Sequence, residues 1–152
     1  MRDPLHLGGL EEGRVLMGFD PGRDKCGLAV VQVQPAWQVL HREVVSAGEA
    51  LARLQALWQQ FGAERLILGN QTTARGWKRQ LESLLPPQQI VLVDERHSSE
   101  EARRRYWEVY RPRWWQHLLP KGLRLPERAY DDLVALILVE RYWRGQARAE
   151  PT

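Results

Sequence analysis

Cysteine is almost absent from this sequence, which has 152 residues and a single cysteine, Cys26. One cysteine cannot form an intramolecular disulfide, and such sparing use is typical of proteins of the reducing cytoplasm. Long apolar runs are also missing, because no stretch approaches the ~20 residues that a membrane-spanning helix needs. Residues 1–13 are polar and rich in glycine, without the apolar segment of a signal peptide. The sequence therefore predicts a cytoplasmic protein with no membrane partner.

Lysine is also rare in this sequence. Of the 22 Lys and Arg residues only three are lysine, so arginine carries nearly all of the positive charge. Guanidinium groups bind phosphates through paired hydrogen bonds and stack on bases, which favours a nucleic-acid partner. A GC-rich genome produces the same bias, and the net charge is only +3. The nucleic-acid interpretation therefore depends on finding a site.

The length fits one domain with a single hydrophobic core. We expect a loose tail over 1–13, one domain over 14–146 and a second tail over 147–152. Three Val-rich runs with short connections predict antiparallel strands, and two shorter apolar runs alternate with helical patterns. The expected strands are 14–19, 27–33, 37–45, 65–68 and 90–93, and the expected helices are 47–61, 73–85, 98–110 and 127–144. The predicted fold class is α/β: a mixed five-stranded sheet, with three antiparallel strands followed by two parallel ones and helices on both faces.

Aspartate is also used sparingly, and outside the tail it lies mostly at the ends of predicted elements. Asp20 ends the first strand, Asp94 and Glu95 end the last strand, and Asp131 and Asp132 lie in the first turns of the final helix. In this topology the first, fourth and fifth strands run parallel, so their carboxyl ends share one edge of the sheet, where ligands collect. We therefore expect acids from three elements to converge at that edge.

Converging carboxylates predict a metal site, because they repel one another and a divalent cation relieves the repulsion. Oxygen ligands favour Mg²⁺ or Mn²⁺, and the four histidines are too scattered to form a zinc cluster. Two such ions about 3.5–4 Å apart promote phosphodiester hydrolysis. Each acid alone has an ordinary alternative: Asp20 as a turn residue, the acids of the last strand as partners of Arg96, and those of the final helix as complements to its dipole.

A second candidate surface follows the last strand, where RRRYWEVYRPRWW spans residues 103–115. Interleaved arginines and aromatics are typical of surfaces that bind phosphates and stack bases. Helical spacing places Arg103, Arg104 and Trp107 on the outer face, although a solvated arginine face with aromatics covering the core has the same pattern. The predicted nucleic-acid contacts are the backbone N–H near Gly22 together with Arg96, Arg103, Arg104, Trp107, Arg111, Arg113, Trp114 and Trp115.

Three segments carry a resemblance to a known family: GFDPGRDKCGLAV (18–30), VDERHSSEEARRR (93–105) and YDDLVALILVERYW (130–143). They are similar to the Asp-x-Gly opening, the Asp-Glu-Arg segment and the closing helix of YqgF/RuvX-type proteins. These belong to the RNase H-like superfamily and are described as Holliday junction resolvases or pre-16S rRNA-processing nucleases. The resemblance implies an RNase H-like fold and a nuclease that hydrolyses phosphodiester bonds in structured nucleic acid with Mg²⁺ or Mn²⁺.

Carried over by position, the family's metal-binding acids fall on Asp20, Glu95 and Asp131, which are therefore the expected catalytic residues. Asp132 is a fourth candidate metal ligand, although the alignment of the closing helix selects Asp131. The loop GNQTTARGW (69–77) departs from the family pattern, so structured RNA and branched DNA both stay open as substrates. A junction resolvase needs two active sites, which implies a homodimer.

Two other functions compete with this interpretation. A nucleic-acid-binding module without hydrolysis would use the same fold and the same Arg/Trp surface, although the retained acids favour an enzyme. The Asp-x-Gly hairpin also resembles the phosphate motif of actin-like kinases and ATPases. Those proteins clasp a nucleotide between two such domains, and 152 residues hold only one.

Overall fold

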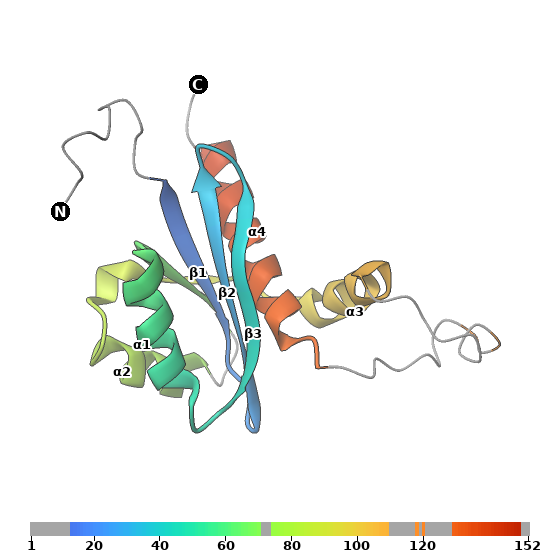
Figure 1. Cartoon of the computed structure of the whole chain (residues 1–152), viewed down its shortest axis with the longest axis horizontal. Coiled ribbons are helices and arrows are strands. Elements are labelled where there is room, and N and C mark those ends of the chain that lie inside the picture. Colours follow the sequence, from blue (N-terminus) through green and yellow to red (C-terminus); the bar gives the residue numbers. More distant parts are fainter. Residues whose placement is uncertain (1–12, 71–73, 110–117, 119, 121–128, 150–152) are drawn as a thin grey trace.

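The computed structural model describes residues 13–70, 74–109, 118, 120 and 129–149. In this part the chain forms one five-stranded sheet with helices on both faces (Figure 1). The strands are β1 (Arg14–Asp20), β2 (Lys25–Gln34), β3 (Gln38–Ser46), β4 (Arg65–Gly69) and β5 (Ile90–Val93), and the helices are α1 (Ala50–Phe61), α2 (Ala74–Glu82), the 3-10 turn η1 (Pro87–Gln89), α3 (Ser98–Val109) and α4 (Asp131–Ala149). The predicted fold class is confirmed.

The strand order β3-β2-β1-β4-β5 brings the strand ends that carry acids to one edge. β1 pairs antiparallel with β2, and β2 with β3, whereas β1 and β4 are parallel, as are β4 and β5. Phe19 of β1 lies opposite Leu68 of β4, so Asp20 and Gly69 come next on the two strands. On its other side Asp20 pairs with Gly27 of β2.

One face of the sheet is covered by α1 and α2. Alternate residues of β1 and β2 point to this face, and Phe19 and Leu28 belong there to one core cluster with Leu54 of α1. α1 ends where Gly62 adopts a left-handed conformation with φ of 63°, and its N–H donates to the Trp58 carbonyl. The predicted helix stop at this glycine is confirmed.

The opposite face is covered by α4, with α3 packed on its outer side (Figure 1). Leu16 and Ile67 of the sheet contact Leu138 of α4, while Tyr106 of α3 packs against Ile137. None of the helices in the described ranges has the length and apolarity needed to cross a membrane.

Several helix ends differ from the prediction. α1 begins at Ala50 because the chain first makes a turn, in which the N–H of Glu49 donates to the carbonyl of Ser46 at 3.0 Å, while the N–H of Ala47 is bound to the carbonyl of Asp24 at 2.8 Å. α4 begins at Asp131 and continues to Ala149, so residues 147–149 are helical rather than part of a tail. No proline interrupts this segment before Pro151, and it is rich in good helix formers.

Candidate active site

Two glycines let α4 lie directly on the sheet. A Cβ on Gly18 would overlap the carbonyl oxygen of Ala135, and a Cβ on Gly27 would overlap that of Asp131. Since no larger residue fits at either place, the backbone of α4 approaches β1 and β2 more closely than side chains would otherwise allow. The first residue of α4 therefore lies over Gly27, the residue paired with Asp20.

Asp20 and Asp131 consequently share a hydrogen bond between their carboxyl groups. Burial raises the pKa of Asp20 to about 8, and the negative charges of Asp131 and Glu95 add to the effect. The pKa of Asp131 is also raised, mainly by burial, while its hydrogen bond with Asp20 acts in the opposite direction. Both shifts favour the neutral form, so the pair is expected to hold a proton at neutral pH.

Glu95 fills the space at the carboxyl end of β4. Its residue is only 9% exposed, and a Cβ on Gly69 would overlap one of its carboxylate oxygens. The N–H of Asn70 donates to the carbonyl of Val93 at 3.0 Å, which joins the ends of β4 and β5. β4 itself ends without an acid, and Glu95, the second residue after β5, brings a carboxylate to that position. Asp20 thus lies near enough to Glu95 and Asp131 for their charges to raise its pKa, whereas the roles of the three as catalytic residues and metal ligands stay predictions.

The donor set of these three residues suits Mg²⁺ or Mn²⁺, since it consists of carboxylate oxygens alone. Within the described part of the chain, no three acidic, histidine or cysteine side chains form a ready-made metal cage. The raised pKa of Asp20 nevertheless fits a cation, because positive charge that replaced the proton shared with Asp131 would relieve the repulsion. The three residues thus have the right chemistry for the ion. A proton shared by Asp20 and Asp131 would have to leave before both carboxylates could bind it.

Asp132 has other partners than the acids. One of its oxygens accepts a hydrogen bond from the N–H of Leu133 at 3.0 Å, and the other lies 3.6 Å from the Arg42 guanidinium. The sequence interpretation missed Arg42, whose side chain reaches Asp132 from β3. No sequence signal marks this pair, because β3 and α4 are far apart along the chain. A role for Asp132 as a metal ligand stays a prediction.

The hairpin amide singled out in the sequence also has a partner. The N–H of Gly22 donates to Sγ of Cys26 at 3.5 Å, and the thiol donates to the Gly22 carbonyl at 3.7 Å. A phosphate would have to displace the thiol from this N–H, so a contact between Gly22 and nucleic acid stays a prediction.

The predicted basic surface is exposed in part. The side chain of Arg96 is 85% exposed and lies 3.7 Å from Asp94, while Arg103 and Arg104 are exposed on α3. The outward orientation predicted for Trp107 is wrong, because its ring is half-buried and packs edge-on against Tyr106, with centroids 4.9 Å apart. The remaining predicted contacts lie outside the described residues: Arg111, Arg113, Trp114 and Trp115.

This chain resembles known proteins in its structure but not detectably in its sequence. No protein-family model matches the sequence, and no curated protein matches it. In structure the chain is similar to Thermus thermophilus RuvC, with a TM-score of 0.56 and 20% identity over 87% of this chain and 96% of that one. A second structure, T. thermophilus RuvC in complex with Holliday junction substrate, has a TM-score of 0.55 and 21% identity, and the match covers 90% of this chain and 97% of that one. The fowlpox virus Holliday junction resolvase has a TM-score of 0.57 and 12% identity, and the match covers 87% of this chain and 99% of that one.

These likenesses establish the fold. The mixed sheet with helices on both faces is the RNase H-like fold of RuvC, and it spans nearly the whole length of each of these structures. The RNase H-like prediction is therefore confirmed.

Proposed function

We propose that this protein is a divalent-metal-dependent endonuclease that hydrolyses phosphodiester bonds in branched DNA, with Asp20, Glu95 and Asp131 as its catalytic acids. The observation that supports the proposal is the proximity of three acids from separate elements. Asp20 of β1 lies near Glu95 of the β5–α3 turn and Asp131 of α4, at one edge of the sheet. They do so on a fold shared with two Holliday junction resolvases, one of them solved with its junction.

The chemistry assigned to these residues is the hydrolysis of a phosphodiester. A bond forms between a water oxygen and phosphorus, and the bond from phosphorus to the leaving sugar oxygen breaks. Asp20, Glu95 and Asp131 would hold the cation, which supplies positive charge to the phosphate when it is bound. A cation would compete with the proton shared by Asp20 and Asp131 for the same oxygens, so ion binding should strengthen as the pH rises.

Substrate class and assembly are the finer parts of the proposal. The three sequence motifs resemble those of YqgF/RuvX-type nucleases, which supports a cytoplasmic enzyme and makes a pre-16S rRNA end the alternative substrate. A four-way junction has two strands to cut, so junction cleavage calls for a homodimer. The exposed Arg96, Arg103 and Arg104 are assigned to phosphate contacts beside the acids.

A cleavage assay on matched substrates tests the proposal. The substrates are a four-way DNA junction, a linear duplex of the same sequence and an RNA hairpin with a 5′ extension, each with Mg²⁺, Mn²⁺ or a chelator. We expect the junction to be cut only with metal. Asp20→Asn and Glu95→Gln should lower the rate at least about 10³-fold, because the ion site contributes several kcal/mol to the transition state.

Asp24→Asn is the matched control, since Asp24 is an exposed acid of the same hairpin and should leave the rate unchanged. Cleavage of the RNA but not of the junction would replace branched DNA by an RNA precursor as the substrate. Salt-dependent binding of all three substrates without any cleavage would favour the non-catalytic nucleic-acid-binding module instead.

A further inference from the structure

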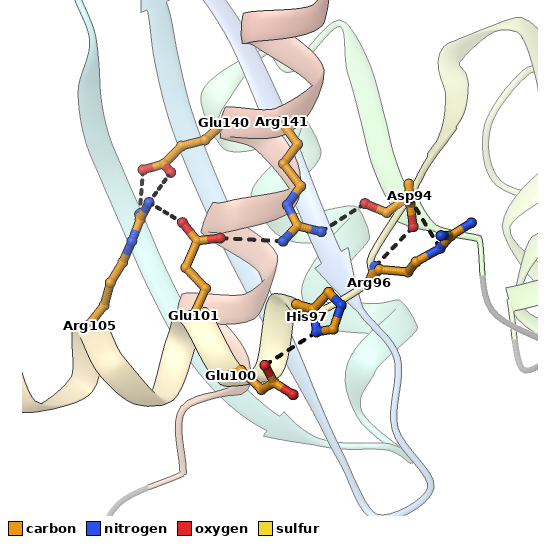
Figure 2. Close-up of polar contacts among 8 residues, drawn as sticks. All are labelled: Asp94, Arg96, His97, Glu100, Glu101, Arg105, Glu140 and Arg141. Atoms are coloured by element: carbon orange, nitrogen blue, oxygen red, sulfur yellow. Dashed lines mark hydrogen bonds and ion pairs between the residues drawn. The ribbon is translucent and has the colours of Figure 1, made fainter. Parts of the chain in front are cut away.

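Four charged side chains join α3 to α4 (Figure 2). Arg105 of α3 donates to Glu140 of α4 at 2.6 Å and to Glu101, one turn earlier on α3, at 2.8 Å. Arg141 of α4 donates to the second oxygen of Glu101 at 3.3 Å. Each of the four side chains is between 16% and 27% exposed, so their ion pairs are partly shielded from solvent. Shielding strengthens such pairs relative to surface ones.

Arg141 also reaches beyond the two helices. Its other terminal nitrogen donates to the backbone carbonyl of Asp94 at 3.0 Å, and this residue directly precedes Glu95 (Figure 2). α4 therefore carries Asp131 at its first residue and, nearly three turns later, a contact with the turn that bears Glu95. One helix thus carries one of the acids that lie outside β1 and contacts the residue that precedes the other.

The turn after β5 contains short-range hydrogen bonds. The side chain of Asp94 accepts from the N–H of Arg96 at 3.0 Å, and the Glu95 carbonyl accepts from the N–H of Ser98 at 3.0 Å. His97, at the centre of the turn, has a φ of 60°, a left-handed conformation that is uncommon for residues with a Cβ. The ion pair of Arg96 with Asp94 is highly exposed and so contributes little.

We propose that Arg141 is a positioning residue, which holds the β5–α3 turn so that Glu95 stays in register with Asp20 and Asp131. The importance of this register for catalysis rests on the proposed function. A guanidinium is suited to the task because its planar fork serves two acceptors at once, here the Asp94 carbonyl and Glu101. Arg105 binds the opposite oxygen of Glu101, so it belongs to the same α3–α4 network but makes no hydrogen bond to the Asp94 carbonyl.

Three variants separate positioning from general stability. Arg141→Gln removes both contacts. Arg141→Lys keeps a charge for Glu101 but lacks the fork that serves Glu101 and the Asp94 carbonyl together, so the fold should be retained while the contact with the turn is weakened. Arg105→Gln is the matched control, because it breaks the same α3–α4 network without touching the turn. Urea unfolding of all three measures how much stability the network provides.

Amide hydrogen exchange by NMR measures the local stability of the turn directly, through the exchange rates of the N–H groups of Arg96 and Ser98. We expect Arg141→Gln to speed exchange at both about tenfold or more, the size associated with losing a hydrogen bond to a charged group. Arg141→Lys should show a smaller increase, and Arg105→Gln should stay within about twofold of wild type. Equal exchange in wild type and Arg141→Gln overturns the inference, as does an equal effect of Arg105→Gln.

Junction cleavage gives the functional consequence. Loss of a residue that orients metal ligands lowers activity about 10- to 100-fold, so Arg141→Gln should lower kcat by this amount while KM for the junction is unchanged. Arg105→Gln should leave kcat within about threefold. If wild type cuts no substrate, the proposed function fails, whereas the exchange rates still decide whether Arg141 holds the turn.

Discussion

The carboxyl pair of Asp20 and Asp131 makes the stability of this protein depend on pH, and Asp20→Asn is expected to remove that dependence. The pKa of Asp20 is about 8 in the folded state instead of 3.8, because burial and two neighbouring acids disfavour the ionised form. Between these values the folded state holds a proton that the unfolded chain has released. The free energy of unfolding therefore falls as the pH rises through this window.

The expected size follows from the pKa values. Each pKa unit corresponds to about 1.36 kcal/mol, so Asp20 alone lowers the free energy of unfolding by up to about 4 kcal/mol between pH 5 and pH 8. Solvent reaches part of this site and reduces the effect, and we expect a fall of about 1–4 kcal/mol. Asparagine resembles the protonated acid, since it is neutral and its amide can donate to Asp131. The variant should lack this fall and be the more stable protein at pH 8.

Urea unfolding at pH 5, 6.5 and 8, followed by tryptophan fluorescence in the presence of a chelator, measures the effect. Asp24→Asn serves as the control and should follow wild type at every pH, because this acid is exposed. If Asp20→Asn loses as much stability as wild type between pH 5 and pH 8, Asp20 is not protonated at neutral pH and the reasoning is refuted.

Three further changes test the site and the core. Mg²⁺ at 100 times its Kd should raise the free energy of unfolding at pH 8 by about 2.7 kcal/mol, and Glu95→Gln should lose most of that gain. Gly27→Ala should cost about 1–3 kcal/mol in urea unfolding, because its Cβ would overlap the Asp131 carbonyl. Gly48→Ala, with nothing within 4 Å of its Cβ, should stay within about 0.5 kcal/mol, and equal effects of the two glycines would contradict the close packing of α4. Leu54→Ala should cost about 2–5 kcal/mol, since this side chain is fully buried, and a loss below about 1 kcal/mol would contradict its place in the core.

Much of the fold was predictable because its signals are local. The short apolar runs of β1 and β2 predict buried strands, and both faces of the sheet are indeed covered. Gly62 ends α1 where the sequence predicts it. The start of α1 was missed because it depends on a hydrogen bond between Ala47 and Asp24, in a hairpin 23 residues earlier.

The site was predictable at the level of its acids and not of their contacts. Strand ends and topology bring Asp20, Glu95 and Asp131 to one edge. Their closeness depends on glycines that admit a helix backbone or a carboxylate, and such packing leaves no periodic signal.

Long-range ion pairs were missed for a related reason. The spacing of Ser98 and Glu101 matches a capping box, yet the Ser98 N–H donates to the Glu95 carbonyl and Glu101 binds two arginines. Arg141 lies 47 residues from its acceptor Asp94. Only the three-dimensional arrangement brings such partners together.

Anomalous diffraction from crystals soaked with Mn²⁺ at pH 8 tests the central claim most directly, because it locates the ion without requiring knowledge of the substrate. The account predicts an anomalous peak bound by carboxylate oxygens of Asp20, Glu95 and Asp131 at about 2 Å. Soaked crystals with no peak among these residues, and with Asp20 still hydrogen-bonded to Asp131, would contradict it.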